Sequence, residues 1–244
     1  MTQVLIGTSG WTYPDWKGTF YPAKLPNAKF LEFYGNQFST VEVNYSFYRL
    51  PTAATYEKWV AQVPKGFVFA VKASRLITHI KRLQGADEPW DVFLQNTQSL
   101  GSRLGPILFQ FPASFRIDQA RLSEFLNMAR TVMSGANLRL VFEFRHASWF
   151  VDKIYRLLSD HGAALCIADS PRYPRREIAT TTFMYLRFHG RNQLFASKYT
   201  KTDLSKEARK IRRYVQGGQD VYAYFNNDAQ GYAVKNARML MTMI

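Results

Sequence analysis

The sequence predicts an α/β fold, a (βα)8 TIM barrel. Eight short apolar runs follow one another along the 244 residues, and most of them precede a segment with helical periodicity. This alternation is typical of parallel βα units, and the length lies in the usual range for one such barrel. No repeat, low-complexity tract or linker divides the chain. We therefore expect one domain over residues 1–244.

The expected strands cover residues 4–9, 40–47, 67–74, 106–112, 138–145, 163–169, 181–190 and 220–228. The expected helices show spacings near 3.6 residues and cover residues 29–36, 52–62, 88–101, 118–130, 149–161, 203–216 and 231–243. Thr52, Asp118 and Asp203 are suited to cap three of these helices. Between these elements we expect a long aromatic-rich loop over residues 10–30 and an exposed basic loop over residues 170–177.

A doubly wound open sheet is the structural alternative. Such a sheet usually begins with a Gly-rich turn that leads directly into a helix. Here the first strand leads into GTSGWTYPDWKG, which continues as a loop and lacks the GxGxxG spacing. Eight strands also favour closure into a barrel.

Charge and cysteine content limit the partners and the location. The chain has 32 Lys and Arg against 18 Asp and Glu, a net charge of +14, which favours an anionic small molecule or a nucleic acid as partner. Cys166, the single cysteine, lies in an apolar run and is expected to be buried and reduced. The sequence begins without an export signal and has no run of 18 apolar residues, so we expect a cytoplasmic protein with no membrane partner. The oligomeric state is not predictable.

Side chains of barrel strands alternate between the helix layer and the barrel interior, so the inward set can be read from the sequence. Seven strands place a polar residue at the inward position near the C-terminal end, where TIM barrels carry their active sites. The inward set comprises Glu42, Asn44, Ser46, Lys72, Ser74, Gln110, Glu143, Arg145, Asp169, Arg187, His189, Asn226 and Asp228. Such groups are expected either to pair internally or to bind a ligand. The alternative without chemistry is an ion-pair network of Glu42, Glu143 and Asp169 with Lys72, Arg145 and Arg187.

The chain resembles the DUF72 (YecE-like) family. The resemblance rests on GTSGW followed by FYP, on EVNYSFYRLP, FAVKAS, LFQFP, EFRHASW and RFHG, and on FNND near the end, which together span nearly the whole chain in order. Ser46 stands where the family often has Thr, a change that keeps the hydroxyl group. The resemblance implies a TIM barrel, and the activity of the family is largely undetermined.

Glu42 and Glu143 are the best candidates for an acid/base pair, with His189 and Asp169 as further catalytic candidates. The alternative for each of the two glutamates is a structural role, in which it forms a salt bridge with Arg145 or Lys72 and takes no part in catalysis. Lys72, Arg145 and Arg187 would bind a phosphate or carboxylate group. The other candidate substrate-binding residues are Trp11, Asn44, Tyr48, Gln110, Trp149, Asn226 and Asn227. The aromatic ones would stack on a sugar or a nucleobase or simply pack loops onto the barrel.

We expect no organic cofactor. Glu42, Glu143, Asp169 and His189 could form a carboxylate-rich site for Mg or Mn. This divalent metal site is not favoured, because the sequence contains no HxH, HExxH or paired CxxC spacing.

The leading functional hypothesis is an enzyme, of hydrolase type, that acts on a phosphate-bearing or nucleic-acid substrate. A nucleic-acid-binding barrel without catalysis is the first alternative, and it predicts salt-sensitive binding. A carbohydrate-processing enzyme that uses the paired carboxylates is the second, although the basic mouth suits neutral sugars poorly.

Overall fold

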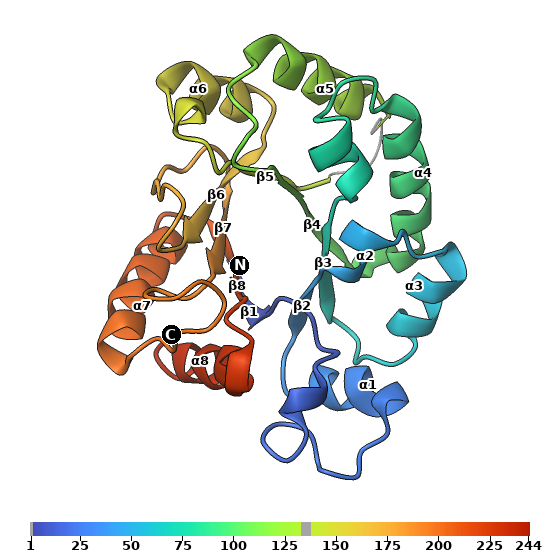
Figure 1. The fold of residues 1–244 in the computed structure, drawn as a ribbon, viewed down its shortest axis with the longest axis vertical. Coiled ribbons are helices and arrows are strands. Elements are labelled where there is room, and N and C mark those ends of the chain that lie inside the picture. Colours follow the sequence, from blue (N-terminus) through green and yellow to red (C-terminus); the bar gives the residue numbers. More distant parts are fainter. Residues whose placement is uncertain (1, 133–137) are drawn as a thin grey trace.

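The computed structural model describes residues 2–132 and 138–244, and it shows a nearly closed barrel of parallel strands with helices around it (Figure 1). The prediction of a (βα)8 barrel is confirmed. The eight strands found in these residues lie in the sheet order β1-β8-β7-β6-β5-β4-β3-β2. They are β1 Val4–Thr8, β2 Thr40–Val43, β3 Val68–Lys72, β4 Leu104–Gln110, β5 Leu140–Glu143, β6 Ala164–Asp169, β7 Phe183–Phe188 and β8 Asp220–Phe225.

The helices are α1 Phe30–Gly35, α2 Tyr45–Tyr48, α3 Ala53–Val60, α4 Asp87–Thr97, α5 Gln119–Val132, α6 Asp152–Asp160, α7 Lys201–Gln216 and α8 Tyr232–Met241. Asp118 caps α5 as expected, because its carboxylate accepts from Arg121 N. The prediction of Asp203 as a cap was wrong by three residues. Thr200 is the N-cap of α7, and Asp203 is its partner in a capping box. None of the described helices is long and apolar enough to cross a membrane.

β1 and β2 are the first and last strands of the sheet order, and they lie next to each other where the barrel closes. Gly7 lies so close to β2 that a Cβ atom there would be 2.3 Å from Thr40 O. The hydroxyl of Tyr34 accepts from Thr8 N at 2.9 Å and donates to Thr40 O at 3.0 Å, so a side chain from α1 bridges the two strands. The backbone of Gly10 then donates to Glu42 O at 2.8 Å. These contacts bring the loop after β1 next to the end of β2.

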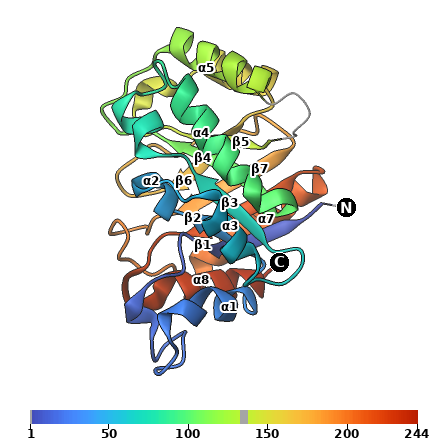
Figure 2. The same ribbon diagram turned by 90° about the vertical axis from the view of Figure 1, so that its right-hand side faces the viewer.

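Two apolar layers hold the barrel together. One packs the outward side chains of the strands, such as Val41, Phe109 and Phe142, against the helices. The other fills the barrel interior with Leu5, Ala70, Leu108, Val141, Ala164, Cys166, Ala168, Phe183, Tyr185, Tyr222 and Tyr224. Cys166 is buried, as its apolar surroundings in the sequence predict. The filled interior leaves the C-terminal mouth as the place for polar side chains, and Figure 2 shows α2 on that side, away from the N-terminus.

All of the expected strands except 163–169 end earlier in the structure than the sequence predicts. The expected strand 40–47 stops at Val43, because residues 45–48 form the short helix α2. The hydroxyl of Ser46 donates to Lys72 O at 2.6 Å and thereby fixes α2 on the end of β3. Likewise, β8 ends at Phe225 and β7 at Phe188, so the polar residues that follow them lie in loops. Gly190 has a φ of 95°, which favours glycine, and it turns the chain away from the mouth directly after His189.

Candidate functional site at the mouth of the barrel

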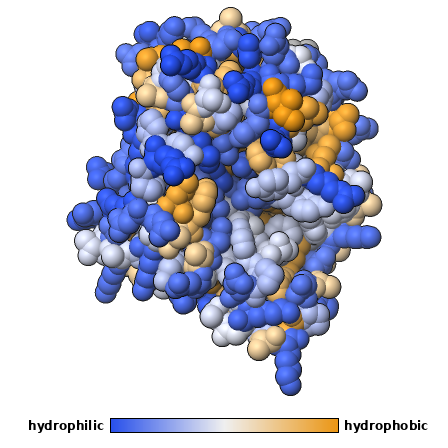
Figure 3. All heavy atoms as spheres, in the orientation of Figure 1, coloured by the Kyte–Doolittle hydropathy of each residue, from blue (hydrophilic) through white to orange (hydrophobic). Residues whose placement is uncertain are grey.

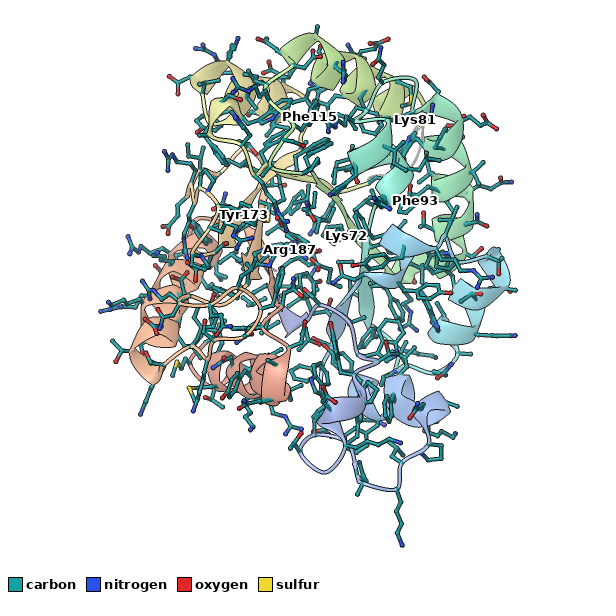
Figure 4. All side chains as sticks on the ribbon, viewed as in Figure 1. Lys72, Lys81, Phe93, Phe115, Tyr173 and Arg187 are labelled. Carbon is teal, nitrogen blue, oxygen red and sulfur yellow. The ribbon has the colours of Figure 1, made fainter. Side chains whose placement is uncertain are left out.

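A cavity of about 510 Å³ opens at the C-terminal ends of the strands. We call it the mouth cavity. It is lined by Tyr13, Asn44, Phe47, Tyr48, Lys72, His79, Gln110, Arg145, Arg187, Phe195, Asn226 and Asp228. Figure 4 shows that Lys72 and Arg187 extend toward the centre of the ring from opposite sides. Figure 3 shows the same face as mostly hydrophilic, with small separate hydrophobic patches.

Arg187 lies at the base of this cavity and binds the carboxylate of Glu42 through two of its nitrogens. Its Nε and Nη2 atoms donate to the two carboxylate oxygens of Glu42 at 2.9 and 2.8 Å. Glu42 also accepts from the hydroxyl groups of Tyr185 and Ser9, both at 2.7 Å. All of these groups are buried, and Glu42 is fully satisfied by four hydrogen bonds. The arrangement is a bidentate arginine–carboxylate pair.

The same guanidinium reaches the second predicted carboxylate. Nη1 of Arg187 donates to Glu143 Oε2 at 2.5 Å, and Nε of Arg145 donates to Glu143 Oε1 at 3.0 Å. Two carboxylates on strands two and five thus share one arginine. The sequence makes them the best candidates for an acid/base pair. Arg187 instead joins them into one network.

Charge pairing keeps both carboxylates ionised. Burial alone would raise the pKa of Glu42 and of Glu143, but Arg187 outweighs it and holds both pKa values below the usual range. A carboxylate that is buried, ionised and occupied by strong donors is a weak base. The two residues selected as the acid/base pair therefore lie in an ion-pair network with Arg187 and Arg145, which is one part of the network named in the alternative without chemistry, and Lys72 is not in it among the described residues. Asp169 is absent from this network.

Two cations of the cavity wall retain free donors. The side chain of Lys72 is 8% exposed and forms no ion pair with any residue in the described ranges. Its ammonium lies over the ring of Phe47, 3.9 Å from the centroid. Arg145 uses only Nε for Glu143, and its guanidinium stacks on Tyr173 at 4.4 Å, which leaves Nη1 and Nη2 without a partner among residues 2–132 and 138–244. Each nitrogen of Arg187, in contrast, already donates to Glu42 or Glu143.

The pKa of Lys72 reflects this lack of a partner. Burial lowers the pKa of its ammonium to about 7, and the positive charge of Arg187 adds to the effect. Glu143 and Glu42 oppose the shift, but they are already neutralised by Arg187. The amine is therefore divided between its neutral and charged forms near pH 7.

Asp228 is an acidic residue of the cavity whose pKa, like that of Lys72, is shifted by burial. Burial raises the pKa of its carboxyl to about 7, although the nearby Tyr13 hydroxyl opposes the rise. Its Oδ1 atom is buried and has no hydrogen-bond partner among residues 2–132 and 138–244. The inward positions of the last expected strand include Asp228, yet we did not select it as a catalytic candidate.

His189 lies at the tip of β7, next to the ion-pair network. Its Nδ1 is 3.1 Å from the Asn226 amide nitrogen, so this geometry assigns the proton to Nε2. Nε2 lies 3.6 Å from Glu143 Oε2, beyond a hydrogen bond. Burial and the charge of Arg187 lower the pKa of the ring. A neutral His189 orients Asn226, which lines the cavity.

Asp169, Trp149 and Asn227 do not lie where the sequence placed them. Asp169 has the outward parity, since Ala164, Cys166 and Ala168 are the inward residues of β6. Its carboxylate accepts from Arg175 and from Tyr199 outside the barrel, both at 2.7 Å.

The other two misplaced residues pack loops. Trp149 is fully buried, donates to Phe115 O at 2.7 Å and stacks on Phe144. Asn227 is fully buried and donates to Ser197 O and Asn236 Oδ1. Neither lines the mouth cavity.

The remaining predicted binding residues surround the mouth. Asn44, Tyr48, Gln110 and Asn226 line the cavity, and Trp11 lines a neighbouring hollow. The sequence did not single out His79 and Phe195. His79 belongs to a π-helical turn, Leu76–Ile80, which no pattern in the sequence signals. Burial and the charge of Lys72 lower its pKa to about 4, so its ring is neutral near pH 7.

The carboxylates predicted as metal ligands are occupied by arginine. Within residues 2–132 and 138–244, no group of three or more His, Cys, Asp or Glu side chains is arranged to hold a metal ion. Glu42 and Glu143 contact Arg187, and Asp169 contacts Arg175. The four predicted ligands therefore do not converge on one point.

Comparison with known proteins finds relatives that cover the whole chain. The UPF0759 protein YunF of Bacillus subtilis is 27% identical over 273 residues, which is 99% of this chain and 95% of the relative. A DUF72 family protein from Thermotoga maritima has a solved structure with 30% identity and a TM-score of 0.88, covering 99% of this chain and 98% of the other. A DUF72 family protein from Enterococcus faecalis is 20% identical with a TM-score of 0.83, covering 99% and 95%.

The family assignment rests on matches that cover nearly the whole chain. The family model described as "Protein of unknown function DUF72" matches residues 5–244, from β1 to the last residue. The solved structure from Thermotoga maritima also matches over 99% of this chain. The resemblance stated from the sequence motifs is therefore confirmed, and the chain belongs to the DUF72 family.

Proposed function

We propose that this protein is an enzyme that acts on a phosphate-bearing substrate in the mouth cavity. The observation that carries the proposal is the buried ammonium of Lys72, which faces the cavity without a carboxylate partner in the described chain. Burying an unpaired cation is costly, and a bound anion would remove that cost. The unused Nη atoms of Arg145 lie on the same cavity.

In this proposal Lys72 and Arg145 both bind the anion, and each makes a different kind of contact with it. The guanidinium of Arg145 offers two parallel N–H donors, which match the oxygens of a phosphate group. The ammonium of Lys72 adds a compact charge. Arg187 and the two glutamates hold Arg145 in place from below, because Glu143 binds both arginines. In this proposal Arg187 is a positioning residue and does not itself contact the substrate.

Proton transfer is assigned to Asp228 instead of Glu42 and Glu143. A general acid or base works best when its pKa lies near the operating pH, and the pKa of Asp228 is about 7. Its Oδ1 is unpartnered, and the residue lines the same cavity as Lys72. A phosphate ester bound at Lys72 and Arg145 would thus lie beside a group able to give or take a proton.

Binding of inorganic phosphate tests the anion site. Titration calorimetry is expected to show binding to the wild type and at least about tenfold weaker binding to Lys72→Met and to Arg145→Met, because each variant loses a charge-assisted contact. The control is Arg121→Met, which removes an arginine from the exposed pair with Asp118 on α5. Equal affinity in all four proteins, or no binding to any, would contradict the proposal.

Turnover separates an enzyme from a binding protein. Release of p-nitrophenol from mono- and bis(p-nitrophenyl) phosphate is expected to depend on pH around 7 and to fall about 10²-fold or more in Asp228→Asn. Phosphate binding should persist in that variant. If phosphate binds but neither ester is cleaved, the non-catalytic alternative gains support.

A nucleic-acid-binding barrel remains the second candidate because of the net charge of +14. Arg175 is not available for such a surface, since it pairs with Asp169, Glu177 and Glu207. Arg172 and Arg176 of the same loop are exposed. This candidate requires binding of DNA or RNA that weakens steeply with salt. The carbohydrate alternative needs free carboxylates, and Arg187 occupies both of them.

A further inference from the structure

A second hollow, of about 620 Å³, opens beside the mouth cavity. We call it the aromatic hollow. It is lined by Gly10, Trp11, Thr12, Tyr13, Asn27, Ala28, Leu31, Asn44, Tyr45, Tyr48, Trp59 and Gln62. Tyr13, Asn44 and Tyr48 line both spaces, so the two are adjacent and share a wall. A single small molecule could occupy both.

Five aromatic side chains, Trp11, Tyr13, Tyr45, Tyr48 and Trp59, form part of the wall of the aromatic hollow. Trp11 and Trp59 stand perpendicular to each other, with centroids 5.1 Å apart and an interplanar angle of 87°. Tyr45 packs its ring at 85° to that of Trp59. Tyr45 and Tyr48 are 48% and 81% exposed, although both belong to the short helix α2 at the rim. Aromatic surface left in contact with water at a concave site gains free energy when a flat ring covers it.

Amide groups lie among these rings. Asn27 and Gln62 lie on the rim, and Asn44 lies on the wall shared with the mouth cavity. The Oδ1 atom of Asn44 is buried and accepts no hydrogen bond from any residue that the structure describes. An unsatisfied buried acceptor is unusual in a folded protein, and a donor from a bound molecule would satisfy it. Amides supply both donors and acceptors, as the polar edge of a nucleobase requires.

We infer that the substrate is a nucleotide, with its base in the aromatic hollow and its phosphate at Lys72 and Arg145. This inference rests on the proposed function, because it takes the phosphate position from that site. A planar base provides a ring that covers Tyr45 and Trp59, and its N–H group can donate to the Oδ1 atom of Asn44. A sugar phosphate without a base would fill the mouth cavity but leave these groups in water.

The experiment compares ligands that share the phosphate and differ in the base. Titration calorimetry is run with inorganic phosphate, ribose 5-phosphate, uridine monophosphate and adenosine monophosphate. At least one nucleotide is expected to bind about fivefold or more tightly than ribose 5-phosphate, since stacking of one base on an aromatic side chain is worth about that factor at the lower end of its range. Tyr45→Ala is expected to remove most of this preference and to leave the affinity for inorganic phosphate unchanged.

The variants are chosen to preserve folding. Tyr45 and Gln62 are at least partly exposed, so Tyr45→Ala and Gln62→Ala remove side chains of the hollow without opening the core. Tyr155→Ala on α6 is the matched control, because this tyrosine is also partly exposed and lies outside both spaces. It should leave the nucleotide preference intact.

The two proposals fail in different ways. If ribose 5-phosphate binds as tightly as both nucleotides, or if Tyr45→Ala keeps the full preference, the nucleotide inference is overturned and the phosphate site stands. If the phosphate ligands do not bind, or bind Lys72→Met as well as wild type, the proposed function fails and the inference fails with it.

Discussion

Two sets of charged side chains meet at the mouth of the barrel, and they differ in how completely they are paired. Below the cavity, Arg187 uses all of its nitrogens on Glu42 and Glu143, and Glu42 is saturated by four donors. On the cavity wall, Lys72 and Asp228 have no charged partner in the described part of the chain. The residues of both sets were read from the sequence as inward positions near the ends of strands.

This difference separates a structural network from a candidate site. A buried group whose hydrogen-bonding capacity is filled can hold its neighbours in place but has little to offer a ligand. A group that is buried and unsatisfied stores an unfavourable energy that a ligand can remove. By this criterion, Arg187, Glu42 and Glu143 support the site, while Lys72 and Asp228 constitute it.

Removal of Arg187 tests the network most strongly. Arg187→Met leaves two buried carboxylates without their shared cation, and it is expected to lower the free energy of unfolding by about 3–5 kcal/mol. Urea denaturation measures the change. Arg121→Met breaks a partly exposed pair within one helix region, and its cost should stay below about 1 kcal/mol. Similar losses in the two variants would show that the network beneath the cavity is no stronger than a surface pair.

Parity in the sequence was sufficient to find the inward residues of most strands. Val41 and Val43 face the helices and Glu42 faces inward, and the alternation in β4 and β5 holds in the same way. It failed at Asp169, because β6 is apolar on both faces and gives no period of two to read. Trp149 and Asn227 follow strand ends, where the chain turns and alternation no longer applies.

The pairing among the inward residues could not be derived from the sequence. It depends on Arg187 extending between Glu42 and Glu143, a side-chain conformation that parity does not determine. As a consequence, the sequence ranked the two carboxylates paired with Arg187 first and passed over Asp228. The π-helical turn that carries His79 to the cavity likewise has no signature in the residues.

The stability of Lys72→Met is expected to be higher than that of the wild type at pH 6. The folded-state pKa of Lys72 is about 7, below the unfolded value, so folding disfavours its charged form. The wild type therefore gains stability as the pH rises from about 7 toward 10, and the variant lacks this gain. From the size of this pKa shift, the advantage of the variant should be roughly 5 kcal/mol at pH 6 and should fall to roughly 1 kcal/mol at pH 10.

Urea denaturation at both pH values gives the two differences. Lys58→Met, at an exposed position on α3, corrects for the loss of a lysine as such. If Lys72→Met is less stable than wild type at pH 6, Lys72 has a partner that stabilises its charge, and the contrast with Arg187 is lost.

A pH-dependent effect in the opposite direction is expected for Asp228→Asn. The pKa of Asp228 is raised to about 7 in the folded protein, so its protonated form contributes stability that is full below about pH 4 and is lost as the pH rises through 7. Asparagine does not titrate, and the variant should therefore gain roughly 4 kcal/mol relative to the wild type between pH 4 and pH 8. Urea denaturation at several pH values measures this change, with Asp15→Asn as the control at an exposed position. A constant difference across that range would mean that the carboxyl is ionised throughout, and Asp228 would then belong with the paired carboxylates below the cavity.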